Sequence, residues 1–202
     1  MAILRSFLAL LAGYLLGSVS VAVVLTKLLY GGDVREQGSG NAGATNVARV
    51  FGFSAGLWTL LGDVIKTLLS MFIGKLIFGD MGAAAAALGC ILGHCWPVYF
   101  GFRGGKAVSV GAAIAIFLDW RLILLLVVVF FVVFFLFRRV SLSSIACAVS
   151  YPFGMLILGG FPWYEMLLAC IILVLVTFKH RENIKRLIQG TEPKFQAGKS
   201  KK

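Results

Sequence analysis

The chain has 202 residues, of which 60% are hydrophobic and only 13% are charged. A soluble domain carries about 25% charged residues and a disordered chain is poor in hydrophobic ones, so this composition excludes both classes. Together with a mean hydropathy of +0.96, it predicts one integral membrane domain over residues 1–202, with a flexible basic tail at about 194–202. The net charge of +11 would suggest nucleic-acid binding in a soluble protein. In a membrane protein such charge first sets the topology, and we expect no nucleic-acid partner.

Seven long apolar runs predict an all-α polytopic membrane protein, a bundle of seven transmembrane helices. Lipid favours helices because every backbone polar group must be paired within the segment, and each run has roughly 15 to 23 residues. The runs are 4–26, 53–73, 82–101, 105–119, 121–137, 141–159 and 162–179. Because 105–119 is short, a re-entrant fourth segment is the alternative.

The positions of the basic residues distinguish these two topologies, since cytoplasmic loops of membrane proteins carry an excess of lysine and arginine. The region after the last span is rich in both, which places the C-terminus in the cytoplasm and, with seven crossings, the N-terminus outside. Only Arg5, Lys75 and Arg121 then face outward. If 105–119 did not cross, the basic pair at 138–139 would face outward as well. The charge bias therefore favours seven crossings.

The longest loop, residues 31–49, connects the first two spans and is rich in small and polar residues. Its glycines, Gly40 among them, allow turns in which several backbone N–H groups converge on one anion. Arg49 at its end offers a planar guanidinium fork that suits phosphate. Neutral hydrogen-bonding side chains are supplied by Ser39, Asn41, Thr45 and Asn46. We therefore predict a phosphate-binding loop, and an ordinary flexible connection is the alternative.

Two opposite charges lie inside the second apolar run. Asp63 and Lys66 are three residues apart, so they can pair on one face of a helix. An unpaired charge at the centre of a bilayer costs about 2.5–3.5 kcal/mol on insertion scales, which means that both must face the protein interior. A structural ion pair and a contribution to the functional site both remain open.

The turn before the fourth run contains Gly104, Gly105 and Lys106. Two glycines before a lysine can bring backbone and ammonium to one phosphate. Lys106 also begins a helix, where the N-terminus favours an anion. The alternative is a basic residue that only anchors the helix at the membrane surface.

Further polar residues open the sixth run and follow the seventh. Ser141 is the expected N-cap of its helix, which leaves Ser143 and Ser144 for other roles. His180 and Asn183 share one helical face, and a basic helix lying on anionic lipid is the alternative for this segment. All of these motifs fall on the predicted cytoplasmic face. We therefore expect a site there for a phosphorylated water-soluble substrate and an acyl chain.

Taken in order, these motifs resemble those of the bacterial acyl-phosphate-dependent glycerol-3-phosphate acyltransferases, the PlsY type. The matching blocks are 38–49, 94–106, 141–144 and 180–193, and they extend over nearly the whole chain. The resemblance implies transfer of an acyl group from acyl phosphate to the 1-hydroxyl of glycerol 3-phosphate, which gives lysophosphatidic acid and phosphate. It implies a multi-pass protein of the cytoplasmic membrane and no cofactor, metal, acyl-CoA or acyl carrier protein.

The resemblance also implies roles for single residues. Those expected to be catalytic are Ser39, Asn41, Arg49, His180 and Asn183. Those expected to bind substrate or phosphate are Gly40, Thr45, Asn46, Gly104, Gly105, Lys106, Ser141 and Ser144. Asp63, Lys66 and Glu192 are expected to be structural or to support the site. The chain departs from the family pattern at Ser109, where threonine is common, and at Thr67, where glycine is frequent.

An acyl phosphate is already activated, so the protein has mainly to position the reactants and neutralise charge. The base is either His180 or an oxygen of the departing phosphate, and any of Ser141, Ser143 and Ser144 can take part. A transporter of phosphate esters is the competing function. Only the charges in the second span favour it. The sequence has no repeated halves of the kind that transporters show, which counts against it.

Overall fold

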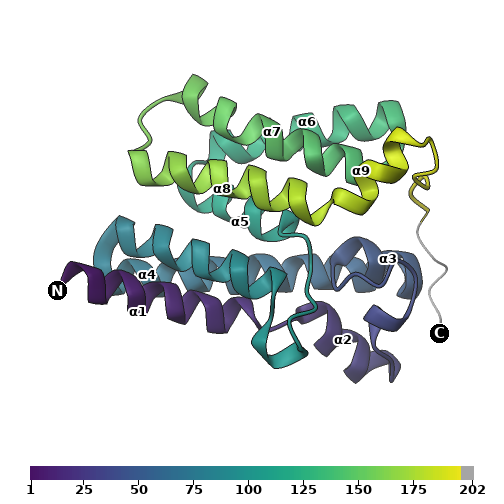
Figure 1. Ribbon diagram of the computed structural model, residues 1–202, viewed down its shortest axis with the longest axis horizontal. Helices are drawn as coiled ribbons and strands as arrows, with labels where there is room; N and C mark the ends of the chain where they lie inside the picture. The colour runs from purple at the N-terminus through teal and green to yellow at the C-terminus, as the bar shows by residue number, and fades with distance from the viewer. Residues whose placement is uncertain (197–202) are drawn as a thin grey trace. The chain divides into compact units, whose positions relative to one another are not determined.

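The computed structural model describes residues 1–196, so the end of the predicted flexible tail, 197–202, lies outside the described residues. Figure 1 shows the helices. In chain order they are α1 (Ala2–Gly17), α2 (Val21–Tyr30), α3 (Ala44–Phe51), α4 (Phe53–Cys95), α5 (Val108–Leu118), α6 (Trp120–Phe137), α7 (Val140–Leu158), α8 (Trp163–Lys179) and α9 (Arg181–Ile188), with short 3₁₀ turns η1 (Val34–Glu36) and η2 (Val98–Phe100). No strand occurs between residues 1 and 196, which confirms the all-α class.

The long element α4 is a helical hairpin and not one rod. Its backbone leaves the helical region at Phe78 and at Gly79, where φ is +58°, a conformation that glycine adopts without strain. The side chains of Lys66 and His94 meet at 3.2 Å, whereas 28 residues of straight helix would separate them by about 42 Å. The two arms of α4 therefore coincide with the separate predicted runs 53–73 and 82–101.

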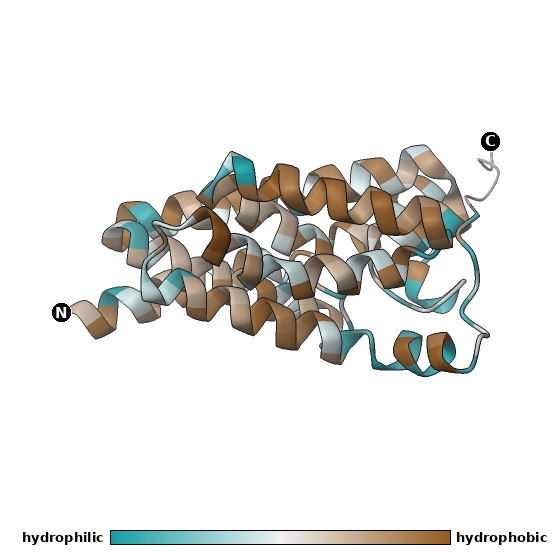
Figure 2. Cartoon of the chain, turned by 90° about the horizontal axis from the view of Figure 1, so that it is seen from above, coloured by the Kyte–Doolittle hydropathy of each residue, from teal (hydrophilic) through white to brown (hydrophobic). Residues whose placement is uncertain are grey.

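Several helices are long and apolar enough to cross a membrane. Four segments meet this test, and a fifth is added if α8 and α9, which are bent by 61°, form one span. The four are Ala2–Tyr30, Phe53–Phe100, Trp120–Phe137 and Val140–Leu158, and Val108–Leu118 is a shorter apolar helix. Figure 2 shows the apolar residues along these helices, and many large ones, such as Leu136 at 71% exposure, lie on the protein surface. The chain is thus an integral membrane protein, and the count of seven crossings stays a prediction.

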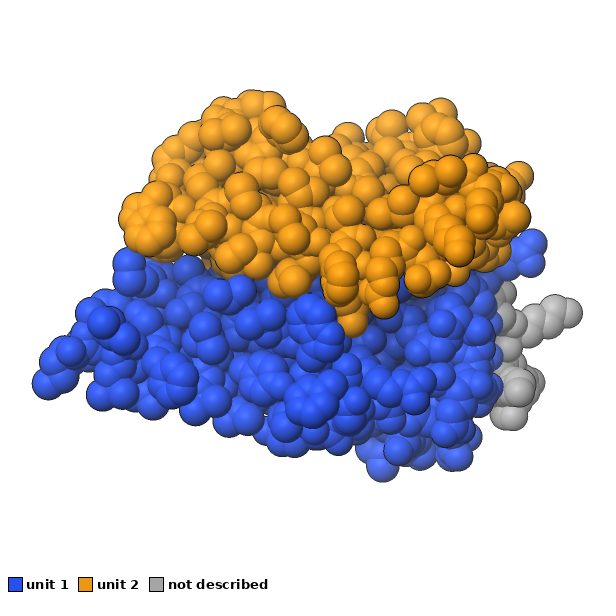
Figure 3. Space-filling model, in the orientation of Figure 1, with its two compact units in different colours: residues 1–114, 196–202 blue, residues 115–195 orange. Residues whose placement is uncertain are grey.

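The described chain divides into two compact units, which are coloured separately in Figure 3. The first unit comprises residues 1–114, with Gln196 added from the end of the described chain, and the second comprises residues 115–195. The first unit holds α1 to α4, and the second holds α6 to α9. The single domain expected over residues 1–202 stays a prediction.

In the first unit, α1 packs closely on the second arm of α4 through small residues. Cβ atoms added to Gly13 or Gly17 would collide with the backbone of the α4 arm, and Cβ atoms added to Gly89 or Gly93 would collide with the backbone of α1. Both helices carry glycines four residues apart, a spacing that lets membrane helices approach each other closely. Tyr14 adds a hydrogen bond of 3.0 Å to the carbonyl oxygen of Trp96. This packing fixes the arm that ends at the predicted turn with Lys106.

In the second unit, α7 packs against both α6 and α8. The buried core includes Leu122, Met155 and Ile172, one from each of these helices. The α7 helix begins at Val140 with Arg139 as its N-cap. The prediction that Ser141 caps this helix is therefore wrong. Ser141 lies one position inside the helix, because its hydroxyl group bonds to the C-terminal segment instead.

Candidate functional site

The polar loop, residues 31–49, is held in shape by one buried side chain. Asn46 is 1% exposed, and its amide nitrogen donates to the carbonyl oxygens of Val34, Gln37 and Asn41 at 3.0 to 3.1 Å. Its side-chain oxygen accepts the backbone N–H of Ser39 at 2.9 Å. Both ends of the amide are thus used within the loop. These contacts favour a scaffolding role for Asn46 over the predicted phosphate contact, which stays untested.

The other polar side chains of the loop are not used in this way. Ser39 is exposed, and Asn41, Thr45 and Arg49 are partly exposed. Within residues 1–196, none of these four side chains makes a hydrogen bond or ion pair. Hydroxyl, amide and guanidinium groups gain most from partners that can satisfy them. The loop therefore presents polar groups whose hydrogen-bonding capacity the fold does not consume.

Arg35 ties the polar loop to the chain segment that precedes Lys106. Its guanidinium donates to the carbonyl oxygen of Phe100 at 2.6 Å and pairs with Asp33 at 2.7 Å. The hydrogen bond from Arg35 holds the pKa of the Asp33 carboxyl at about 2, so the pair is ionised at neutral pH. Arg35 is not among the site residues predicted from the sequence. The pairing of Arg35 with Asp33 can be predicted from their spacing in the sequence, but the contact of Arg35 with Phe100 cannot.

The Gly-Gly-Lys turn, residues 104–106, packs against the polar loop and against the end of α4. A Cβ atom on Gly105 would lie 3.1 Å from the carbonyl oxygen of Ala42, and one on Gly104 would collide with the carbonyl oxygen of His94. Ala107, which follows the turn, has φ +64°, and an L-residue in this region costs about 1–2 kcal/mol. The turn therefore has a defined and strained shape, in which only glycine fits at 104 and 105. The structure thus brings together two motifs that are far apart in the sequence.

Beneath this turn lies the buried charge cluster, which consists of Asp63, Lys66 and His94. Their exposed fractions are 1%, 7% and 5%. The ammonium of Lys66 lies 2.8 Å from an Asp63 carboxylate oxygen, 2.9 Å from the Val19 carbonyl oxygen and 3.2 Å from Nδ1 of His94. Three polar atoms of the protein thus surround this ammonium. The ion pair expected from the spacing is formed, and its geometry favours the structural alternative for Lys66.

In the second unit, the carboxylate of Glu192 gathers residues from three segments. Oε1 accepts hydrogen bonds from the hydroxyl of Ser141 at 2.6 Å and from the amide of Asn183 at 2.7 Å. Oε2 accepts one from Nε of Arg186 at 2.7 Å, and Arg139 donates to the Glu192 carbonyl oxygen at 3.1 Å. We call this set the Glu192 cluster. It joins the start of α7 to α9 and to the chain that follows α9.

Charge and burial have opposite effects on Glu192. Burial by itself would raise the pKa of the carboxyl, but hydrogen bonds from Ser141, Asn183 and Arg186 and the charge of Arg186 outweigh it. The pKa of Glu192 therefore lies below its usual value of 4.5, and the group is ionised at neutral pH. The structural role expected of Glu192 agrees with these contacts, because three side chains bond to one buried carboxylate.

His180 occupies the bend between α8 and α9 and is 3% exposed. Its Nδ1 lies 2.8 Å from the carbonyl oxygen of Val176. Because a carbonyl oxygen can only accept, Nδ1 must carry the hydrogen, and Nε2 of the neutral ring is then the basic nitrogen. Asn183 lies in α9, three residues after His180, and their common helical face stays a prediction. The Asn183 amide, however, already bonds to Glu192.

The predicted serines at the start of α7 all have partners. Ser141 bonds to Glu192, as above, whereas Ser143 and Ser144 donate to the carbonyl oxygens of Arg139 and Val140 at 3.2 and 2.8 Å. Such bonds to the preceding turn are common for serine inside helices. Ser141 is therefore the one of the three whose hydroxyl points to another segment.

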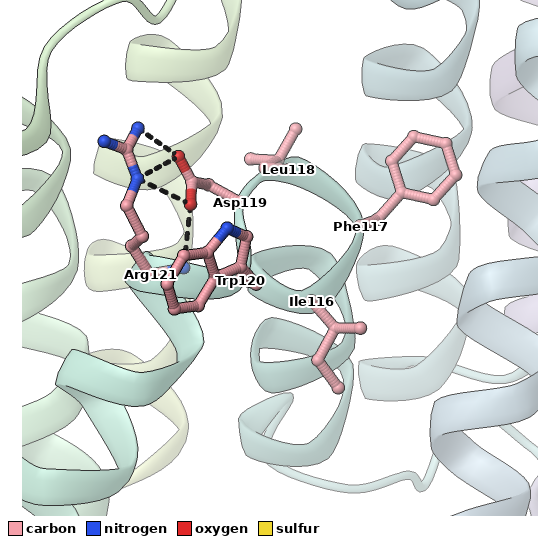
Figure 4. A pocket seen from close by; sticks show the side chains of 6 residues that line it. All are labelled: Ile116, Phe117, Leu118, Asp119, Trp120 and Arg121. Carbon is pink, nitrogen blue, oxygen red and sulfur yellow. Dashed lines mark hydrogen bonds and ion pairs between the residues drawn. The ribbon is translucent and has the colours of Figure 1, made fainter.

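A hollow in the surface lies elsewhere, at the turn between α5 and α6. It is lined by residues 116–121, and Figure 4 shows Asp119 and Arg121 paired at its edge. Their closest atoms are 2.7 Å apart. The hollow contains none of the predicted site residues. Within residues 1–196, no group of three or more His, Cys, Asp or Glu side chains is arranged to hold a metal ion.

Comparison with known sequences places these motifs in context. Residues 7–190 match the sequence model of a family described as glycerol-3-phosphate acyltransferase. The glycerol-3-phosphate acyltransferase of Carboxydothermus hydrogenoformans is 38% identical over 193 residues, which cover 96% of this chain and 98% of that protein. The enzyme of the same name from Parasynechococcus marenigrum is 40% identical over 195 residues, which cover 96% and 91%.

Two solved structures are also similar to this chain. Both are crystal structures of PlsY (YgiH), an integral membrane glycerol 3-phosphate acyltransferase. The glycerol 3-phosphate form has a TM-score of 0.88 at 34% identity and covers 95% of this chain and 96% of that chain. The lysophosphatidic acid form has a TM-score of 0.86 at 33% identity and covers 95% of both.

Replacing Glu192 by Gln should lower the melting temperature at neutral pH, because the charged acceptor of Arg186 is lost. Hydrogen bonds to charged groups contribute about 1.5–3 kcal/mol. The folded-state pKa is lowered from 4.5, so the stabilisation is complete above that value and is lost as the pH falls through the folded pKa. The gap between wild type and Glu192→Gln, measured by thermal unfolding in detergent micelles, should shrink on acidification.

The matched control is Glu182→Gln, in α9, the helix that precedes Glu192. Glu182 is 69% exposed and its ion pair with Arg181 is 3.9 Å long, so its loss should change the melting temperature little. A gap for Glu192→Gln that stays constant as the pH falls would contradict the assignment of a stabilising charge.

Proposed function

The chain belongs to the glycerol-3-phosphate acyltransferase family, of the PlsY type, and we propose that its acyl donor is an acyl phosphate. It is an acyltransferase that acts on glycerol 3-phosphate. With this donor the acyl group passes to the 1-hydroxyl, which forms the ester of lysophosphatidic acid, and the C–O bond to phosphate breaks. The two crystal forms of the similar PlsY hold glycerol 3-phosphate and lysophosphatidic acid, which agrees with this substrate and this product.

The observation that carries the site assignment is the contrast within the polar loop. The side-chain amide of Asn46 is hydrogen-bonded within the loop. The side chains of the other four polar residues predicted for the site make no hydrogen bond or ion pair within residues 1–196; these are Ser39, Asn41, Thr45 and Arg49. The Gly-Gly-Lys turn packs against the same loop. We therefore assign the phosphate of glycerol 3-phosphate to this part of the first unit. Arg49 supplies a guanidinium fork, Lys106 an ammonium, and Gly40, Gly104 and Gly105 allow close approach of the backbone.

His180 and Asn183 of the second unit are assigned to the chemical step. The hydrogen bond from Nδ1 of His180 to Val176 leaves Nε2 as the basic nitrogen, which suits acceptance of the proton from the 1-hydroxyl. An oxygen of the departing phosphate is the alternative base. Because the donor is already activated, positioning and charge neutralisation supply most of the acceleration. Ser141 and Ser144 are assigned to substrate or phosphate binding, with Ser141 favoured because its hydroxyl points to another segment, where it bonds to Glu192.

The site is assigned to the cytoplasmic face of the cytoplasmic membrane, and the chain to seven crossings with the N-terminus outside. The support is the excess of basic residues on one side of the predicted topology and the two arms of α4, which account for two of the predicted crossings. The short helix Val108–Leu118 is the segment on which the count depends. The transporter alternative is not favoured, because the similar curated proteins and solved structures are acyltransferases.

The donor is tested with purified protein in detergent micelles. Acyl phosphate together with glycerol 3-phosphate should release inorganic phosphate and form lysophosphatidic acid in equal amounts. The acyl-CoA and the acyl carrier protein thioester of the same chain length should give no product. Release of phosphate that does not depend on glycerol 3-phosphate, or product from a thioester alone, would refute the proposed donor.

The site assignment is tested by substitutions in the polar loop. Arg49→Ala should lower kcat/KM for glycerol 3-phosphate by roughly 10- to 100-fold, the effect of losing a charge-assisted hydrogen bond of about 1.5–3 kcal/mol. Arg49→Lys should recover only part of this, since the fork is lost. Asn46→Ala should act mainly by lowering the melting temperature. Arg5→Ala, at an exposed position in α1, is the control, and equal kinetics for Arg49→Ala and Arg5→Ala would rule out the assignment.

The topology is tested with single cysteines in a variant that lacks the four natural ones. Cysteines at positions 103 and 185 should react with a membrane-impermeant maleimide only after the cells are permeabilised. A cysteine at position 75 should react in intact cells. If 105–119 does not cross, positions 103 and 185 lie on opposite sides, so labelling of only one of them in intact cells would reject seven crossings.

A further inference from the structure

The buried charge cluster contacts no substrate in the proposed mechanism, yet it lies directly beneath the Gly-Gly-Lys turn. Asp63, Lys66 and His94 are each less than a tenth exposed. They come from both arms of α4, two from the first arm and one from the end of the second. Ionisable groups buried in apolar surroundings are costly and are retained where they perform a task. Their contacts indicate what this task is.

The cluster holds the ring of His94 in place. The ammonium of Lys66 lies 3.2 Å from Nδ1 of His94. The carboxylate of Asp63 is 3.6 Å from the same nitrogen. Nδ1 therefore faces both members of the ion pair. Asp63 in turn holds Lys66 in place at 2.8 Å.

The other side of His94 meets the Gly-Gly-Lys turn. Its carbonyl oxygen accepts the backbone N–H of Gly105 at 3.0 Å. A Cβ atom on Gly105 would collide with Nε2 of the His94 ring, and one on Gly104 would collide with the His94 carbonyl oxygen. Backbone and ring of a single residue thus form the surface on which both glycines rest.

The cluster also reaches the chain on the far side of the turn. The hydroxyl of Ser109, in the first turn of α5, donates to Oδ2 of Asp63 at 3.0 Å. Lys106 therefore lies between two anchored points, Gly105 on His94 and Ser109 on Asp63. This contact gives position 109 a reason to carry a hydroxyl, which either serine or threonine can supply.

We propose that His94, held by Asp63 and Lys66, is a positioning residue that sets the place of the Gly-Gly-Lys turn and so the affinity for the phosphate of glycerol 3-phosphate. Ser109 serves the same purpose from the other side. The proposal rests on the proposed function, in which this turn binds that phosphate. None of the four side chains enters the reaction itself. Their loss is expected to act on substrate binding and not on the chemical step.

The test compares Ser109→Ala, Ser109→Thr and His94→Asn in the phosphate-release assay with purified full-length protein. Ser109→Ala removes one hydrogen bond to a charged group and should raise KM for glycerol 3-phosphate by about tenfold. KM for acyl phosphate and kcat should change less than about twofold, since an intact reaction step needs no contact with the cluster. Ser109→Thr keeps the hydroxyl and should behave as the wild type. His94→Asn keeps a polar group beside Lys66 but loses the surface beneath Gly105, and should also raise KM for glycerol 3-phosphate.

Two results would overturn the proposal. One is an unchanged KM for glycerol 3-phosphate in both Ser109→Ala and His94→Asn. The other is a loss of melting temperature and kcat with both KM values unchanged, which a merely structural cluster would give. Lys106→Ala, assayed in parallel, separates a failure of the positioning role from a failure of the proposed binding site. If it raises KM for glycerol 3-phosphate and the cluster variants do not, only the positioning role fails. If Lys106→Ala leaves this KM unchanged, the proposed binding site fails as well.

Discussion

The arrangement of the first unit depends on how two charges inside an apolar helix are neutralised. Asp63 and Lys66 lie within the run 53–73, where an unpaired charge is strongly unfavourable. Their ion pair, at 2.8 Å, removes most of that cost but leaves further acceptor and donor capacity to be satisfied. The remaining partners are Val19 and His94, from the connection between α1 and α2 and from the second arm of α4. The pairing that makes insertion possible therefore also fixes which helices pack together.

The same physical rule separates scaffold residues from candidate substrate-binding residues. A buried polar side chain must find partners inside the protein. Asn46 finds them within the polar loop, and Glu192 finds them on several segments. A side chain intended for a substrate must keep its capacity until the substrate arrives. Arg49, at the end of α3, meets this condition within residues 1–196. The polar loop contains Asn46 and Arg35, whose side chains are bonded within the fold. It also contains Asn41 and Arg49, whose side chains are not. Membership of the loop alone therefore does not assign a role.

The sequence was sufficient for elements whose character is imposed by lipid. The run 121–137 agrees with α6 to within one residue, because a membrane span must be apolar along its whole length. The first run, 4–26, was predicted as one span. It lies within the candidate span Ala2–Tyr30, but the helix is interrupted before Val21, where the backbone of Ser20 is extended. The glycines four residues apart in α1 and α4 were visible in the sequence and would have predicted that these helices pack closely.

Contacts between distant positions could not be predicted, and they assign most of the roles. The bond from Arg35 to Phe100 spans 65 residues, and that from Ser141 to Glu192 spans 51. No periodicity connects such pairs. The N-cap expected at Ser141 shows the consequence, because local propensity favoured a cap while the hydroxyl was needed by a buried carboxylate. The N-cap preference of serine fails at Ser141 because the long-range hydrogen bond to Glu192 takes its hydroxyl group.

The strained, anchored form of the Gly-Gly-Lys turn has a further physical consequence at a membrane surface. Lipid headgroups present phosphates at high local concentration, and flexible basic residues near them are attracted without selectivity. A lysine with a long mobile stem behaves in this way when its backbone is free. Lys106 instead follows two glycines packed on His94 and precedes Ala107, whose φ is +64°. Its backbone is placed in advance, so at the proposed phosphate site an anion would gain the full interaction only when it also fits the glycines and the polar loop. Preorganisation of this kind converts a general attraction for phosphate into a preference for one phosphate ester.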